Sequence, residues 1–308
     1  MTGFETEGNG ISAMNFGCEQ LRSAMLTGQI LEGRAHAFDA QKQLRFHFVG
    51  CEGVMPYEEC ADGIANGTVR QIAILTRVGR PVCFVVTGFT AGKNGPVALL
   101  SRTKAQQRCR QQYLSSLRCG DILSCTVTHI EPFGAFCDVG CGIAALLPID
   151  CLSVSRISSP ADRVKVGTKL HCAIRSIDQY GRLVLSLREL MGTWEENASR
   201  FAAGETVLGI VRSVEEYGVF VELAPNLAGL AEPGGKPLAP GQVVSVYIKS
   251  ILPEKMKVKL VILSALEEEY FIAPQYFIQE GHIDHWVYSY PNAHRMIETD
   301  FSQPSSET

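Results

Sequence analysis

The chain contains 308 residues, of which 46% are hydrophobic and 19% are charged, and its formal net charge is −4. This length suits two or three domains, and the composition is that of a folded chain because it supplies enough apolar residues for a core. The longest apolar runs fall far short of the roughly 20 residues of a membrane-spanning helix, and the N-terminus has no secretion-signal pattern. We expect a cytoplasmic protein that is neither secreted nor membrane-embedded. Its acidity excludes nucleic-acid binding through bulk positive charge.

An N-terminal segment, residues 1–27, precedes the first copy of a pattern that occurs three times. This copy joins residues 28–56 to residues 67–89, in which apolar and polar residues alternate over short stretches between glycines and prolines. Such alternation is typical of short antiparallel strands. We predict a degenerate five-stranded barrel over residues 28–104, followed by a basic helical linker over residues 105–118.

The second and third copies match each other closely. Residues 120–148 align with residues 204–233, and residues 166–187 align with residues 240–263. The repeat length of roughly eighty residues corresponds to one small barrel per copy. The predicted order is a barrel over residues 119–189, a helical linker over residues 190–203, a barrel over residues 204–265 and an acidic tail, residues 266–308, to which we assign no function.

The first copy departs from the second in its aromatic residues. Phe46 aligns with Phe136, but Gln43 stands where Phe133 would be, and Arg80 aligns with Arg182. The first copy has therefore lost one aromatic residue of the pattern.

The eleven cysteines predict thiols and not disulfides. Their number is odd, none lies beyond Cys172, and several, such as Cys83 and Cys125, occupy apolar strand-like positions. Cys137 and Cys141 are closely spaced, but a structural zinc site needs four grouped ligands and no second pair follows. We predict reduced core thiols, no metal site and no cofactor.

Two aromatic residues flank a glycine in each of the last two copies: Phe133 and Phe136, then Tyr217 and Phe220. Flat rings stack on unpaired RNA bases for roughly 1–3 kcal/mol each, while Arg and Lys follow the phosphates. Residues three apart on a strand face opposite sides, so we expect the intervening glycine to bend the strand and bring both rings to one face. Core packing is the alternative, and the recurrence in two copies favours stacking.

The run from Gly120 to Gly140 and the segment from Val166 to Leu187 resemble the S1 RNA-binding domain family. The resemblance covers the second copy nearly end to end, the third copy well and the first loosely. It implies a fold dominated by β-strands, with three tandem OB-fold barrels of five strands joined by short helices and an RNA face on strands two and three. The implied RNA-binding residues are Phe133, Phe136, Asp178 and Arg182 in the second copy, Tyr217, Phe220 and either Lys257 or Lys255 in the third, and Phe46 and Arg80 in the first.

Three positions depart from the family pattern. A histidine that often follows the third strand is replaced by Pro148 in the second copy and by Glu232 near the same place in the third. In addition, Leu252 stands where the second copy has Asp178. These departures weaken the expected phosphate contacts.

The tandem arrangement resembles the bacterial ribosomal S1 family, in a short Firmicutes-type form. The resemblance implies binding of single-stranded RNA, chiefly mRNA, in translation, attachment to the small ribosomal subunit through residues 28–104, and a monomeric, ribosome-associated protein of the bacterial cytoplasm. Two alternatives stay open: an S1-domain scaffold for protein interactions, and a subunit of an RNA-decay or transcription complex. A phosphate-binding loop, a metal-binding helix motif and a nucleophile–base pair are all missing, so we predict no enzymatic activity.

The basic stretch over residues 102–118 carries Arg and Lys without an acidic residue. Two interpretations stay open. It is either a solvated helix face or a bridge along which RNA phosphates pass between barrels.

Overall fold

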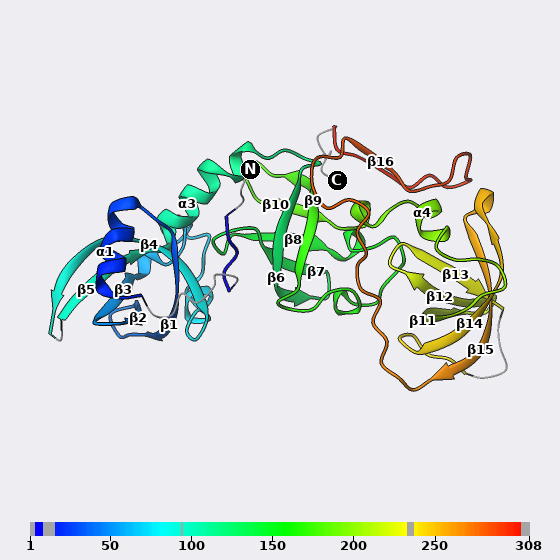
Figure 1. Cartoon of the computed structure of the whole chain (residues 1–308), viewed down its shortest axis with the longest axis horizontal. Helices are drawn as coiled ribbons and strands as arrows, with labels where there is room; N and C mark the ends of the chain where they lie inside the picture. The colour runs from blue at the N-terminus through cyan, green and yellow to red at the C-terminus, as the bar shows by residue number, and fades with distance from the viewer. Residues whose placement is uncertain (1–3, 9–15, 94, 233–236, 303–308) are drawn as a thin grey trace. The chain divides into compact units, whose positions relative to one another are not determined.

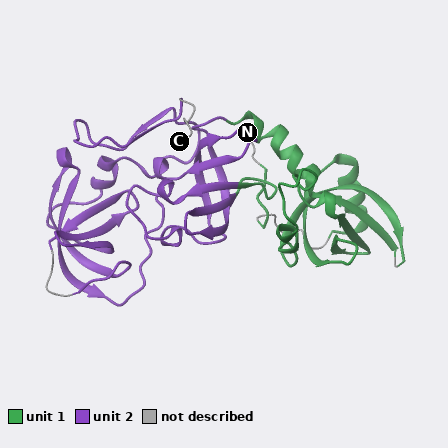
Figure 2. Cartoon of the chain, turned by 180° about the vertical axis from the view of Figure 1, so that it is seen from behind, with its two compact units in different colours: residues 1–117, 138–144 green, residues 118–137, 145–308 purple. Residues whose placement is uncertain are grey.

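The computed structural model describes residues 4–8, 16–93, 95–232 and 237–302. The described residues form three closed five-stranded barrels and a short two-stranded sheet (Figure 1), which confirms the predicted fold dominated by β-strands. They divide into two compact units (Figure 2): Met1–Leu117 with Asp138–Ala144, and Arg118–Cys137 with Ala145–Thr308. Within the described residues, no helix is long and apolar enough to cross a membrane.

The first barrel has the strand order β1-β2-β3-β5-β4 and closes through β1 and β4. Helix α1 precedes it and packs Leu21 and Ala24 into its core beside Phe46 and Phe84. Its strands are β1 (Leu31–Phe38), β2 (Gln43–Phe48), β3 (Cys51–Pro56), β4 (Pro81–Gly92) and β5 (Gly95–Ser101), and its helices are α1 (Cys18–Thr27), η2 (Tyr57–Glu59) and α2 (Gln71–Leu75).

The fourth and fifth strands of this barrel lie later in the chain than the sequence alignment placed them. The apolar run before Thr76, aligned with a strand, forms helix α2, of which only Ile74 is buried. Short apolar runs suit a helix as well as a strand, so the pattern alone did not distinguish them. As a result, β4 begins at Pro81 and β5 at Gly95.

The second barrel has the order β10-β8-β7-β6-β9 and closes through β9 and β10. Its core consists of alternate strand residues such as Leu123, Ala135 and Leu147, all nearly fully buried. Its strands are β6 (Ile122–Glu131), β7 (Gly134–Asp138), β8 (Ala144–Pro148), β9 (Lys169–Ile177) and β10 (Leu183–Ser186), and helical turns η4 (Ile149–Cys151) and η5 (Pro160–Asp162) occupy its long loop. It is preceded by α3 (Arg102–Gln112) and η3 (Leu114–Ser116).

The third barrel has the order β11-β12-β13-β15-β14 and closes through β11 and β14. Its core extends to Trp194 of helix α4, so the connecting segment packs as part of the barrel and is not a flexible linker. The elements are η6 (Arg188–Met191), α4 (Trp194–Ala198), β11 (Thr206–Glu215), β12 (Gly218–Ala224), β13 (Leu227–Ala231), β14 (Val243–Leu252), η7 (Pro253–Lys255) and β15 (Lys257–Leu266).

The C-terminal tail packs against the second and third barrels, which belong to the same compact unit. It contains β16 (His285–Val287) and β17 (Glu298–Asp300), which pair with each other. Trp286, Tyr288 and Phe301 join the core of the third barrel. The tail also contacts the second barrel, since the Tyr276 hydroxyl accepts a hydrogen bond from the His171 N–H at 3.1 Å.

All eleven cysteines are free, and nine of them are buried. Burial raises the pKa of the Cys60 thiol to about 12, so this group stays a neutral thiol at physiological pH. The cysteines thus act as small apolar core residues, as the sequence predicted.

Candidate nucleic-acid interface

An exposed aromatic pair lies at the β6–β7 hairpin of the second barrel. Phe133 belongs to the turn and is 55% exposed, whereas Phe136 is half-buried on β7. The ring centroids are 6.1 Å apart with planes at 90°. This edge-to-face contact holds the outer ring in place while leaving its surface open to a stacking partner.

The third barrel repeats this geometry at its β11–β12 hairpin. Tyr217 lies in the turn and is 67% exposed, and Phe220 is half-buried on β12. Their centroids are also 6.1 Å apart, with planes at 87°. The structure therefore brings together both predicted aromatic pairs in one arrangement.

The glycine between the two rings has a different role from the predicted strand bend. A Cβ atom at Gly134 would lie 2.6 Å from the Leu147 carbonyl oxygen, and one at Gly218 would lie 2.6 Å from the Ala231 carbonyl oxygen. Glycine is needed because the next strand passes close by. The rings share a face because the first belongs to the turn, so strand alternation does not apply to it.

An ion pair adds charge to the second barrel at the β9–β10 hairpin. The Arg182 Nε atom lies 2.5 Å from Asp178 Oδ2, and the Arg182 side chain is 73% exposed. Hydrogen bonds from the Arg182 backbone N–H and side chain keep the pKa of Asp178 below its usual value. The carboxylate therefore stays ionised and orients the guanidinium, which keeps donors free for a phosphate.

Sequence reasoning missed Tyr180, which lies in the same hairpin. Its side chain is 71% exposed, and the Arg182 guanidinium carbon lies 5.4 Å from its ring centroid. A flat ring beside a guanidinium is a further base-stacking surface. The signal was an aromatic residue between the two predicted charged positions.

In the third barrel, the β14–β15 ladder identifies which lysine matches Arg182. Lys257 pairs with Leu252, just as Arg182 meets Asp178, whereas Lys255 lies in the turn η7. Lys257 therefore takes the equivalent position, and both lysines are exposed.

A row of outward side chains crosses the third barrel from Phe220 through Leu230 to Lys259, because these residues are direct ladder partners. Lys259 was not among the predicted residues. The row combines an aromatic ring, an apolar side chain and an exposed cation, as single-stranded RNA requires.

The prediction for Phe46 was wrong. Its side chain is fully buried in the first barrel's core, where it cannot stack on a base. The bulge of β1 lies opposite Phe46 and Arg45, and the same bulge of β11 lies opposite Val221 and Phe220. Phe46 thus corresponds to buried Val221, and Arg45 to Phe220. A shift of one residue reverses the face of a strand residue.

The alignment of Arg80 with Arg182 was also wrong. The Ala35 N–H donates to the Arg80 carbonyl, as the Val127 N–H donates to the Thr168 carbonyl. Arg80 therefore corresponds to Thr168 at the start of the fourth strand. It is exposed, but it lies away from the position of Arg182.

The basic residues of helix α3 have partners within their own compact unit. Arg102 is 3% exposed and pairs with Glu7, Arg110 pairs with Asp62, and Arg108 donates to the Gly28 carbonyl. These contacts favour a structural helix over a phosphate-tracking bridge.

Residues 116–188 match the family model of the S1 RNA binding domain. The small ribosomal subunit protein bS1 of Leuconostoc lactis is 34% identical over 117 residues, which are 36% of this chain and 27% of that protein. A polyribonucleotide nucleotidyltransferase of Prochlorococcus marinus is 35% identical over 96 residues, which are 31% of this chain and 13% of that protein. The matched segments thus span about a quarter or less of these relatives.

Among solved structures, a multidomain protein with nucleic acid binding domains from Streptococcus pneumoniae is 17% identical, over 77% of this chain and 73% of that one. Its TM-score is 0.26, so the family assignment rests on the sequence matches. These matches cover the segment that forms the middle barrel with its paired aromatic rings. The middle barrel of this chain is therefore an S1 RNA-binding domain.

Proposed function

We propose that this chain binds single-stranded RNA through the aromatic and basic faces of its second and third barrels. The observation that carries the proposal is the repeated ring pair, with centroids 6.1 Å apart in both barrels and an exposed outer ring in each. Stacking on such rings is tolerant of sequence, and Arg182, Lys257 and Lys259 supply charge for the phosphates. Duplex RNA hides its base faces, so single strands are the expected ligand.

The likeness to bS1 proteins extends this proposal to translation. We infer that the bound RNA is mRNA, that the protein associates with the small ribosomal subunit in the bacterial cytoplasm, and that it acts as a monomeric binding protein without enzymatic activity. The similarity to bS1 of Leuconostoc lactis supports the first two statements. The absence of a recognisable catalytic sequence motif supports the last.

The test is a fluorescence anisotropy titration of labelled single-stranded and duplex RNA across a salt series. We expect tighter binding of the single strand and an affinity that falls as salt rises, because bound cations displace counterions from phosphates. Phe133→Ala and Tyr217→Ala should each weaken binding by about 5- to 150-fold, the equivalent of one lost stacking contact.

Tyr270→Ala is the matched control, because this ring is 41% exposed but lies in the tail, outside both faces. Unchanged RNA affinity in the Phe133→Ala/Tyr217→Ala double variant, with an intact circular dichroism spectrum, would reject the stacking faces. Salt-insensitive protein association without RNA affinity would favour a scaffold.

A further inference from the structure

One outward position on the first two strands recurs in all three barrels. In the third barrel it holds Arg212 and Glu222, next to the β-bulge of β11. The equivalent bulge of β1 places His36 and His47 there in the first barrel. In the second barrel, Asp138 takes this place, two residues after Phe136 as Glu222 is two residues after Phe220.

In the third barrel this position is filled by the long loop of the second barrel. Arg163 from that loop is fully buried and donates to the Glu222 carboxylate, while Arg212 pairs with Asp162 at 3.5 Å. The adjacent β12–β13 turn also accepts a backbone hydrogen bond, from the Ser155 N–H to the Pro225 carbonyl at 3.2 Å. A polypeptide segment thus docks on an acidic site.

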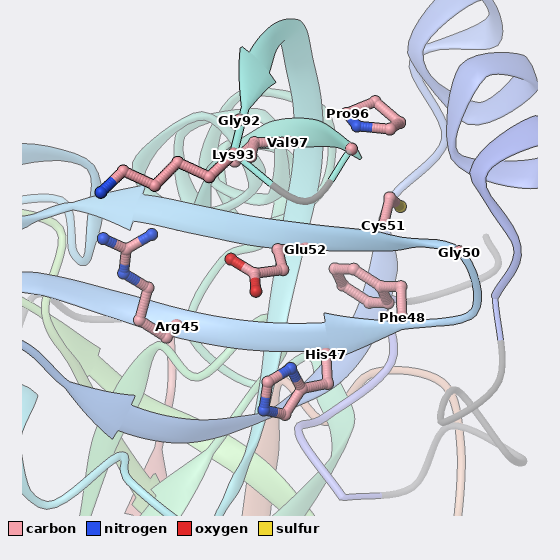
Figure 3. Close-up of a pocket in the computed structure, with 11 residues that line it drawn as sticks. Arg45, His47, Phe48, Gly50, Cys51, Glu52, Gly92, Lys93, Pro96 and Val97 are labelled. Carbon is pink, nitrogen blue, oxygen red and sulfur yellow. The ribbon is translucent and has the colours of Figure 1, made fainter.

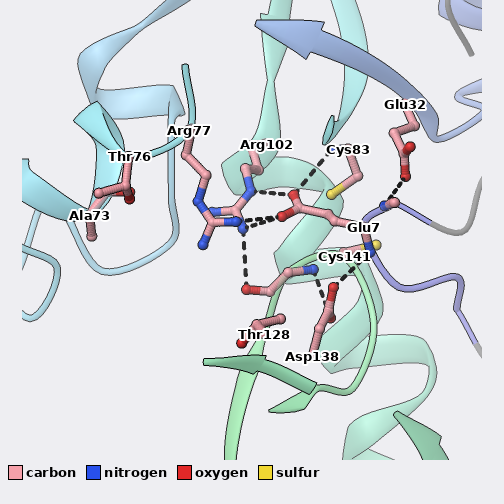
Figure 4. Close-up of polar contacts among 12 residues, drawn as sticks. Glu7, Glu32, Ala73, Thr76, Arg77, Cys83, Arg102, Thr128, Asp138 and Cys141 are labelled. Atoms are coloured by element: carbon pink, nitrogen blue, oxygen red, sulfur yellow. Dashed lines mark hydrogen bonds and ion pairs between the residues drawn. The ribbon is translucent and has the colours of Figure 1, made fainter. Parts of the chain in front are cut away.

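The acidic position of the second barrel is filled in the same manner. The Glu7 backbone N–H donates to Asp138 Oδ2 at 2.7 Å, and Arg102 and Arg77 surround the Glu7 carboxylate (Figure 4). The neighbouring turn accepts a segment as well, because the Cys141 N–H donates to the Glu5 carbonyl at 3.0 Å. All these residues belong to one compact unit.

The first barrel presents this position open and with opposite charge. His36 and His47 stack with centroids 3.6 Å apart, and both are exposed. Beside them lies a pocket of about 530 Å³ between the β2–β3 and β4–β5 hairpins. The charged ends of Arg45, Lys93 and Glu52 gather at this pocket (Figure 3). Cationic groups thus outnumber the single carboxylate.

We propose that the first barrel binds an acidic polypeptide segment of a partner protein in this pocket, with carboxylates facing His47, Arg45 and Lys93. Charge complementarity identifies the anion, because the equivalent acidic sites in the other barrels hold arginines. A polypeptide is favoured over RNA because polypeptide segments fill both equivalent positions.

The composition of the first barrel also disfavours RNA in this pocket. The two positions that carry stacking rings elsewhere hold Lys42 and Arg45, so bases have no ring pair to stack on. Glu52 would repel a chain of phosphates, but it can accept a hydrogen bond from a peptide N–H.

The probe is a fluorescein-labelled peptide of six glutamates, titrated with the full chain at low ionic strength. We expect it to bind, a peptide of six glutamines not to bind, and His47→Ala/Lys93→Glu to weaken the glutamate peptide by at least about tenfold. Lys255→Glu/His294→Ala, which makes the same chemical changes at exposed sites of the other unit, should leave peptide binding in place.

Single-stranded RNA separates this proposal from the RNA faces of the other barrels. We expect unlabelled RNA not to displace the peptide and Phe133→Ala/Tyr217→Ala not to change peptide affinity. The proposal is overturned if the glutamate peptide fails to bind, if both peptides bind equally, or if the His47→Ala/Lys93→Glu variant binds it unchanged. Displacement by RNA would instead assign the pocket to nucleic acid.

Discussion

The first and third barrels share one strand order and one bulge register but place different chemistry on the same backbone. Where the third barrel has the stacking ring of Phe220, the first has Arg45, and where the third buries Glu222 under Arg163, the first exposes His47. The barrel therefore supplies positions, and the residue at each position decides whether it stacks, docks or stays open.

Filled and open docking positions should differ most in stability. Glu222→Gln leaves two buried guanidiniums without their carboxylate and should lower the free energy of unfolding by about 3–5 kcal/mol. His47→Gln, at the open equivalent position, should change it by less than about 0.5 kcal/mol. Urea unfolding, followed for Glu222→Gln by the fluorescence of Trp194 and Trp286 in the third barrel's core, measures the larger effect. Equal effects would contradict the assigned difference in burial.

Phenylalanines that the sequence alignment equated should behave in opposite ways. Phe46→Ala should destabilise the chain by about 3–5 kcal/mol, because it opens a cavity in the first barrel's core. Phe133→Ala should cost little stability and act on RNA affinity. Circular dichroism during urea unfolding, paired with RNA anisotropy, separates the two. A Phe46→Ala variant of normal stability would contradict the register assigned to β2.

The filled position of the second barrel should respond to pH. Burial and the neighbouring Glu7 charge raise the pKa of Asp138 to about 6. The folded state therefore holds this proton more tightly than the unfolded state, so the free energy of unfolding should fall as pH rises from about 4 through 6, by roughly 1–3 kcal/mol. Hydrogen exchange of residues 138–144 measures this change.

Asp138→Asn should remove this pH dependence, while Asp150→Asn, at an exposed carboxylate, should retain it. An identical pH profile for the wild-type chain and Asp138→Asn would show that Asp138 does not titrate in this range.

The smallest expected difference concerns two neighbouring lysines of the third barrel. Lys257→Ala should weaken RNA binding about two- to fivefold and reduce the salt slope by about one, whereas Lys255→Ala should do less, because the ladder gives Lys257 the position of Arg182. Anisotropy across a salt series is the measurement. A larger effect of Lys255 would place the phosphate path over the turn.

Residues of the chain itself determined the repeat, the barrels and the two aromatic pairs, because alternation and spaced glycines are local signals that survive without knowledge of contacts. The same signals did not determine the register of the first barrel. There Phe46 faces the core and Arg80 lies one strand earlier than expected, because a strand's face changes with a shift of one residue.

Only the tertiary structure decided which charges are paired. Glu7 lies 95 residues before Arg102, and Arg163 lies 59 residues before Glu222, so no local pattern links either pair. Burial and ion pairing depend on segments that meet only after folding. For that reason the open, cationic position of the first barrel became visible only beside its two filled equivalents.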